Sequence, residues 1–145
     1  MSISESQALA NRLRELRHQI DLMELEWAAG AACLAGTGYH ELQGSQHASD
    51  FLRHHCAMGE GAVKDRMAVG CCRDVLPESV QALCGGEIGF PHLVQMAHTA
   101  NAVRRSGGPD RAFEEHKLLE RARTESVGRF WHTCQNYLHA CSPDH

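Results

Sequence analysis

The chain lacks the features that membrane spans, secretion signals and β-sheets require. No apolar run among its 145 residues approaches the ~18 residues of a membrane span. The opening stretch, MSISESQALANRLREL, is polar and helical in pattern, which excludes a signal peptide and a transit peptide. Val, Ile and Thr do not alternate with polar residues as they do in strands. We therefore expect an all-α, cytoplasmic protein with no membrane partner.

Motifs of catalysis and metal binding are also missing. The seven Cys residues are odd in number, match no disulfide framework and include no Cys-x-x-Cys pair. Most lie on apolar helix faces, so we expect reduced, buried thiols. His54 and His55 are adjacent and point in different directions, which suits exposed helix positions better than chelation of one metal. The sequence predicts no catalytic residue, no metal and no cofactor; the alternative is a zinc site assembled from distant Cys and His.

The charge balance argues against a strongly basic DNA-binding surface. Net charge is −4 with the eleven His counted as neutral, whereas non-specific DNA binding favours an excess of Lys and Arg. A basic face on an acidic body remains compatible with this total. Residues 51–75 carry four bases and three acids: Arg53, Lys64, Arg66 and Arg73 against Glu60, Asp65 and Asp74.

Apolar residues instead recur at helical spacing along the chain. The longest such stretch, residues 4–35, has a stripe at three- and four-residue steps: Leu9, Leu13, Leu16, Ile20, Met23 and Trp27. The stripe can pack on its own domain, which we expect first, or pair with a second copy. After a loop over 39–44 and a cap at Ser45, further helices are predicted over 46–56, 59–74, 77–83, 91–105 and 110–123. A last helix is predicted to start at Thr124 or Ser126 and to end by Cys141. The prediction is one domain, 1–145, of about six or seven helices.

Residues 52–74 have the spacing of a helix-turn-helix inside a core of residues 46–105. Leu52 and Cys56 would face inward from the first helix, residues 57–59 would form the turn, and Val63 would face inward from the second helix. The free face of that second helix would carry Lys64, Arg66 and Arg73. Arg53 occupies the position where such motifs often have Ala, which is a departure from the pattern.

The segment LPESVQALCGGEIGFPHLVQMA, residues 76–97, resembles the 13E12-repeat family (domain of unknown function 222). The stretches IDLMELEWAAGAACLAGTGYHELQGSQHASDFLRH and LLERARTESVGRFWHTCQNYLHACSPDH resemble the same family, so the likeness covers roughly residues 10–145. More distantly, the central stretch resembles the helix-turn-helix of ParB-type partition proteins, although Gly89 replaces a Ser of that pattern. The residues that carry this second likeness are Leu76, Pro77, Glu78, Gly86, Ile88 and His92. We expect His92 to be structural, as a helix cap.

The family resemblance implies a DNA-binding module that precedes an HNH endonuclease in mobile-element proteins. An HNH site needs a metal-binding His and a His base on a β-hairpin and helix, which this chain lacks. The implied nuclease would lie beyond His145, so we expect no enzyme here. The predicted DNA contacts are Arg53, His54, Lys64, Asp65, Arg66, Arg73, Arg104 and Arg105. The alternative is a protein-interaction or homodimerisation domain that uses the long first helix; a metal-dependent hydrolase is the third hypothesis.

Overall fold

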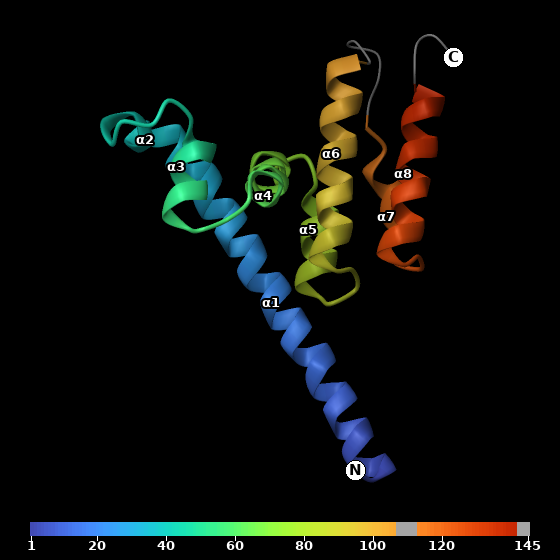
Figure 1. Ribbon diagram of the computed structural model, residues 1–145. Helices are drawn as coiled ribbons and strands as arrows, with labels where there is room; N and C mark the ends of the chain where they lie inside the picture. The colour runs from blue at the N-terminus through green and yellow to red at the C-terminus, as the bar shows by residue number, and fades with distance from the viewer. Residues whose placement is uncertain (107–112, 142–145) are drawn as a thin grey trace.

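One long helix, α1 (Ile3–Thr37), crosses the molecule and projects from it (Figure 1). The Ser2 hydroxyl accepts a hydrogen bond from the Glu5 N–H at 3.0 Å and caps the start of the helix. The helix ends at Gly38, whose φ of 73° lies in the left-handed region that glycine adopts without steric cost. The predicted helix over residues 4–35 is confirmed.

The computed structural model describes residues 1–106 and 113–141, and within these ranges it contains helices and no strand. The all-α prediction is confirmed, and the eight helices are close to the predicted six or seven. After α1 come α2 (Tyr39–Leu42), α3 (Ala48–His55), α4 (Glu60–Cys72), α5 (Pro77–Cys84), α6 (Phe90–Ser106), α7 (Glu115–Ala122) and α8 (Val127–Cys141).

Three local predictions are corrected. The segment expected to be a loop, residues 39–44, contains the short helix α2. Ser45 does not cap α3: that helix begins at Ala48, after His47, whose side chain makes no capping hydrogen bond. The helix predicted over 110–123 begins at Glu115; residues 110–112 of that prediction, and 107–109 of the break before it, lie outside the described residues.

Helix α4 lies at the centre of the fold, between α1 and α6 and against α3 (Figure 1). Its buried side includes Val63, Val69 and Cys72. Gly70 faces α1 so closely that a Cβ atom there would lie 2.2 Å from the carbonyl oxygen of Ala28. The absence of a side chain at Gly70 is what permits this crossing.

The main core forms where α4 to α8 and the second half of α1 meet. Its largest fully buried side chains include Leu83, Leu93, Met96 and Phe130. A smaller cluster, centred on Leu52 and Val63, joins α1, α3 and α4. Burial of these side chains against one another fixes how α1 crosses the rest of the fold.

Polar contacts cap the starts of two helices and tie them to other parts of the chain. The backbone N–H and the hydroxyl of buried Ser79 donate to the Glu115 carboxylate at 2.8 and 2.7 Å, which satisfies free donors at the start of α5. His92 Nδ1 accepts from the Gly89 N–H at 3.1 Å, and its Nε2 lies 2.9 Å from the Glu125 carbonyl oxygen. His92 therefore caps the start of α6, as predicted, and it also ties α6 to the segment before α8.

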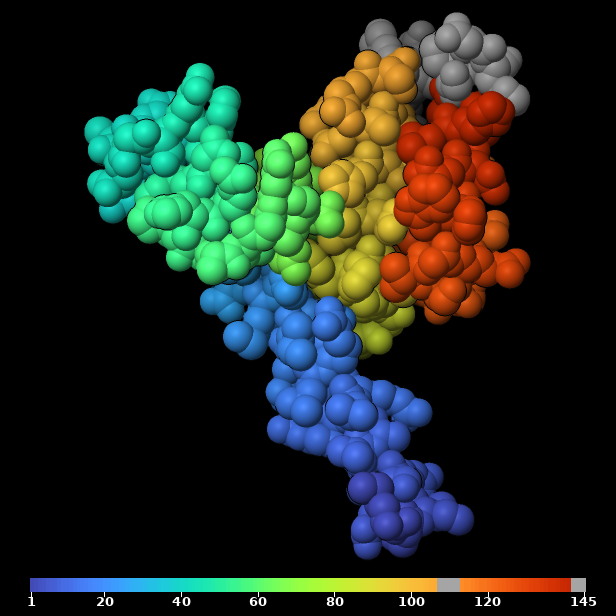
Figure 2. All heavy atoms as spheres, in the orientation of Figure 1, coloured from blue at the N-terminus to red at the C-terminus, as the bar shows by residue number. Residues whose placement is uncertain are grey.

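The first half of α1 extends beyond the body of the molecule, as the dark-blue spheres in Figure 2 show. Every residue from 1 to 15 is exposed. The first expectation for the apolar stripe, that it packs on its own domain, is therefore wrong for this half. The reason lies in the crossing at Gly70: it places α4 and the core against residues 21–35, so the earlier part of the helix runs past them into solvent.

Candidate functional site

The apolar stripe of α1 remains largely exposed along the projecting half and beyond it. Leu9, Leu13 and Met23 keep 47%, 57% and 68% of their surface accessible, and Ile20 is also exposed. Single exposed apolar residues are ordinary, but a contiguous run of them along one helix face is typical of an interaction surface. We define the α1 stripe as these four residues together with Leu16 and Trp27.

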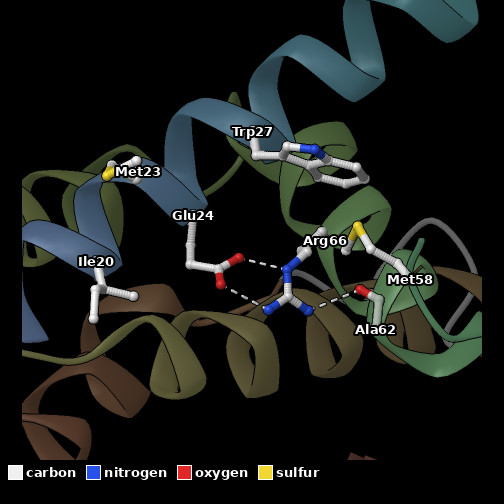
Figure 3. Close-up of a pocket in the computed structure, with 7 residues that line it drawn as sticks. All are labelled: Ile20, Met23, Glu24, Trp27, Met58, Ala62 and Arg66. Atoms are coloured by element: carbon white, nitrogen blue, oxygen red, sulfur yellow. Dashed lines mark hydrogen bonds and ion pairs between the residues drawn. The ribbon is translucent and has the colours of Figure 1, made fainter. Parts of the chain in front are cut away.

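The α1 stripe continues into a groove beside α4. Ile20, Met23 and Trp27 form one wall, and Met58 and Ala62 form the other (Figure 3). The hollow between them has a volume of about 520 Å³, and a second hollow of about 440 Å³ extends it along α1 toward the end of that helix. We call these two hollows together the α1 groove.

The inner end of the α1 groove holds an ion pair. The Arg66 guanidinium donates to both carboxylate oxygens of Glu24, at 2.9 Å from Nη2, and to the Ala62 carbonyl oxygen at 2.9 Å (Figure 3). Its Cζ also lies 5.6 Å from the Phe90 ring centroid. Hydrogen bonding from Arg66 lowers the pKa of Glu24, and the same bonding raises the pKa of Arg66.

Arg66 does not lie on a free outer face of α4, and this corrects the sequence prediction. Its side chain is only 21% accessible because α1 passes beside α4 and brings Glu24 to it. Asp65, predicted on the same face, is hydrogen bonded to His98 Nε2 at 2.8 Å. Lys64 is exposed and forms an ion pair with Glu60 at 2.9 Å, one helical turn earlier.

The remaining predicted DNA contacts are spread over α3, α6 and the residue that follows α4. Arg53 is on α3 and pairs with Asp50 at 3.6 Å, while the neighbouring His54 is exposed. Arg73 follows α4 and donates to the Cys33 sulfur at 3.6 Å. Arg104, on α6, donates to Asn101 at 2.7 Å.

Three of the eight predicted residues do meet. Lys64, Arg104 and Arg105 line one groove of about 570 Å³, together with His98. The floor of this basic groove is α4, and its sides are the start of α3 and the second half of α6. A recognition helix enters the major groove by a projecting face, whereas α4 here lies between two neighbours. The arrangement suits contact with an extended anionic backbone better than insertion of α4.

Two other expectations about side chains are corrected. Cys56 does not face inward: α3 ends at His55, and Cys56 is exposed in the turn. The Cys residues are not mostly buried either, because Cys33, Cys56, Cys71 and Cys84 are exposed and only Cys72 and Cys134 are buried. All seven thiols are free.

Sequence reasoning found the α1 stripe but missed the wall opposite it. Met58 was predicted only as a turn residue, yet it faces Trp27 across the groove (Figure 3). Ala57 before it adopts a φ of 53°, which is rare for a residue with a side chain and reverses the chain direction. A large apolar residue in a turn was the available signal for this wall.

No protein-family model, no curated protein and no solved structure matches the chain. The resemblance to the 13E12-repeat family therefore stays a prediction. In the described part of the chain, no group of three or more His, Cys, Asp or Glu side chains is arranged to hold a metal ion. No helix within residues 1–106 and 113–141 is both long and apolar enough to cross a membrane.

Proposed function

We propose that this chain is a self-association module in which α1 supplies the interface between two copies. The single observation that supports this most is the exposed α1 stripe on a helix that projects from the body (Figure 2). An isolated helix half without tertiary packing is only marginally stable in water. A second helix against the stripe would both bury its apolar side chains and hold the projecting half in helical form.

The extent of the stripe fits what association requires. Burying a half-exposed side chain of Leu size contributes about 1 kcal/mol, whereas bringing two proteins together costs about 4–15 kcal/mol. One or two such residues would not offset that cost. The stripe offers six side chains from each copy, so a symmetric pair brings enough apolar surface for a dimer of moderate affinity.

Light scattering coupled to size-exclusion chromatography tests this function. The wild-type chain of 16.0 kDa is expected to elute with twice that mass. Leu13→Glu with Met23→Glu places two charges on the stripe and should yield a folded monomer. The matched control, Ala8→Glu with Asn11→Glu, adds the same charge on the opposite, exposed face of α1 and should remain dimeric. A monomeric wild-type chain at high micromolar concentration would overturn the proposal.

Binding of a nucleic acid backbone is the second candidate function, and the basic groove favours it. Lys64, Arg104 and Arg105 gather there from α4 and α6. Such contacts release counterions, so the affinity for a labelled random duplex should fall steeply with salt. Lys64→Glu with Arg105→Glu should abolish the binding measured by fluorescence anisotropy. Arg14→Glu with Lys117→Glu makes the same charge change at exposed positions outside the basic groove and is the control.

A further inference from the structure

The α1 stripe continues as a regular repeat into the α1 groove. Its residues are separated alternately by four and three positions: Leu9, Leu13, Leu16, Ile20, Met23, Trp27, Gly30 and Leu34. An average spacing of 3.5 is the repeat of a coiled-coil seam. The seam thus runs from the exposed half of α1, where nothing flanks it, to the half where α3 and α4 add a second wall.

The charges beside the seam differ between the two halves of α1. Residues 3–19 contain three Arg and two Glu, whereas residues 20–37 contain one Asp, two Glu and no Lys or Arg. In a parallel coiled coil, a residue that flanks the seam on one helix lies beside the residue five positions later on the partner helix. Arg12 of one copy would then lie beside the partner's Arg17, which brings like charges together. In an antiparallel pair, Arg12 would lie beside the partner's Glu26. Unlike charges then meet on either side of the two-fold axis. Arg17 lies near the partner's Arg17 at the axis itself, where its own Asp21 is 3.0 Å away and balances its charge.

From these observations we propose that the two copies pair with antiparallel α1 helices, and that the projecting half of each fills the α1 groove of the other. This arrangement rests on the proposed self-association and names its geometry. It is isologous, because both copies use the same surface and each groove is filled once, so the assembly closes as a dimer. The partner of this surface is therefore a second copy of the chain.

One register places side chains of complementary size together. With the two-fold axis beside His18, Leu16 meets the partner's Ile20, Leu13 meets the partner's Met23, and Leu9 meets the partner's Trp27. At the ends, Ser6 lies opposite the partner's Gly30. A Cβ at Gly30 would have no neighbour within 4 Å in the single chain, so the incoming helix has room there. Small residues therefore meet where the partner's helix passes closest to α1.

The two walls of the α1 groove explain why the projecting half of the partner's α1 fills it. Residues 3–15 approach as a helix that is exposed on all sides, whereas residues 23–34 have α3 and α4 beside them. A parallel pair would leave Met58 and Ala62 facing solvent, because each groove would face the partner's groove. The antiparallel pair covers Met58 with the partner's first turns and leaves no apolar half of α1 exposed.

Photo-crosslinking of the full chain distinguishes the two orientations. We would place p-benzoylphenylalanine in place of Leu9 and identify the crosslinked residues by mass spectrometry. The antiparallel dimer predicts crosslinks to the partner's Met23, Trp27 or Met58. Crosslinks to residues 5–13 of the partner would show a parallel pair, and a dimer without any crosslink from this position would also overturn the proposal. The same probe in place of Asn11, on the opposite face, should give no crosslink between copies.

Reversing the charge at position 12 should change the Kd of the dimer in opposite directions for the two orientations. Arg12→Glu should weaken an antiparallel dimer by about two- to tenfold in Kd, since it opposes the partner's Glu26. The same change should tighten a parallel dimer, where it would meet the partner's Arg17. Adding Glu26→Arg should restore wild-type affinity only in the antiparallel case. A monomeric wild-type chain would contradict self-association itself, so the two levels of the proposal fail in different ways.

Discussion

The two halves of α1 share one helical pattern but have opposite environments. In the second half, Ala28 and Ala31 are buried against α4, whereas Leu9 and Leu13 in the first half face solvent. The larger side chains are thus the exposed ones, and the buried contact uses small residues at a close crossing beside Gly70. Ala28 and Ala31 lie outside the α1 stripe, so the apolar periodicity of α1 did not identify the face that packs on its own chain.

A charge added to the buried side of α1 should lower stability most, whereas a charge added to the exposed stripe should hardly change it. Ala28→Glu would place a carboxylate in the contact with α4, where Ala28 is fully buried. We expect it to destabilise the fold by several kcal/mol, as unpaired buried charges do. Leu13→Glu should leave the melting temperature of the monomer almost unchanged. Thermal unfolding followed by circular dichroism measures both, and equal losses would contradict the contrast between the halves.

Gly70→Ala should have the next largest effect. The added methyl group would lie 2.2 Å from the Ala28 carbonyl oxygen, a backbone atom that can move only if the whole crossing shifts. Overpacking of this kind costs about 1–3 kcal/mol. Gly61→Ala is the control in the same helix, because its Cβ would have no neighbour within 4 Å. That variant should be neutral or slightly stabilising by about 0.5–1 kcal/mol, as chemical denaturation would show.

The Glu24–Arg66 pair predicts a pH dependence. Since hydrogen bonding lowers the folded-state pKa of Glu24 below its ordinary value of 4.5, its contribution to stability is present above pH 4.5. That contribution is lost as pH falls through the lowered value. Glu24→Gln should therefore reduce stability at pH 7 and flatten the loss of stability in acid. Unfolding midpoints measured from pH 7 to pH 3 test this, and an unchanged acid slope would count against it.

Alkylation of the native protein perturbs the fold least and distinguishes exposed from buried cysteine thiols. Burial raises the pKa of the Cys72 and Cys134 thiols, so these should resist alkylation in the native protein. The exposed thiols should react quickly: Cys33, Cys56, Cys71 and Cys84. Mass spectrometry after brief alkylation at neutral pH reads out each site. Fast labelling of Cys134 would contradict the described core.

Local signals predicted much of the fold. Pro77 at the start of α5 and the Gly pair at its end bounded that helix to within one residue of what is found. The long apolar stripe predicted α1 almost to its ends. These successes depend on propensities and caps that act within a few residues.

The site could be predicted only in part because it depends on distant contacts. Arg66 was expected to face outward, and nothing in the sequence near it indicates otherwise. Its partner Glu24 lies 42 positions away, so only the folded structure shows the contact. Ser45 failed as a cap because α3 begins three residues later. Lys64, Arg104 and Arg105 were predicted as DNA contacts, but the sequence did not predict that they share a groove. The packing of α4 on α6 brings them together.

Hydrogen exchange of α1 at several protein concentrations tests directly whether a second copy covers the projecting half of this helix. In a monomer, the amides of residues 5–20 belong to a helix without packing and should exchange quickly, while those of residues 22–35 are protected by α4. We predict that the first half becomes strongly protected as concentration rises through the dimerisation range, with little change in the second. Fast exchange in residues 5–20 at every concentration would contradict the claim that a second copy covers this half of α1.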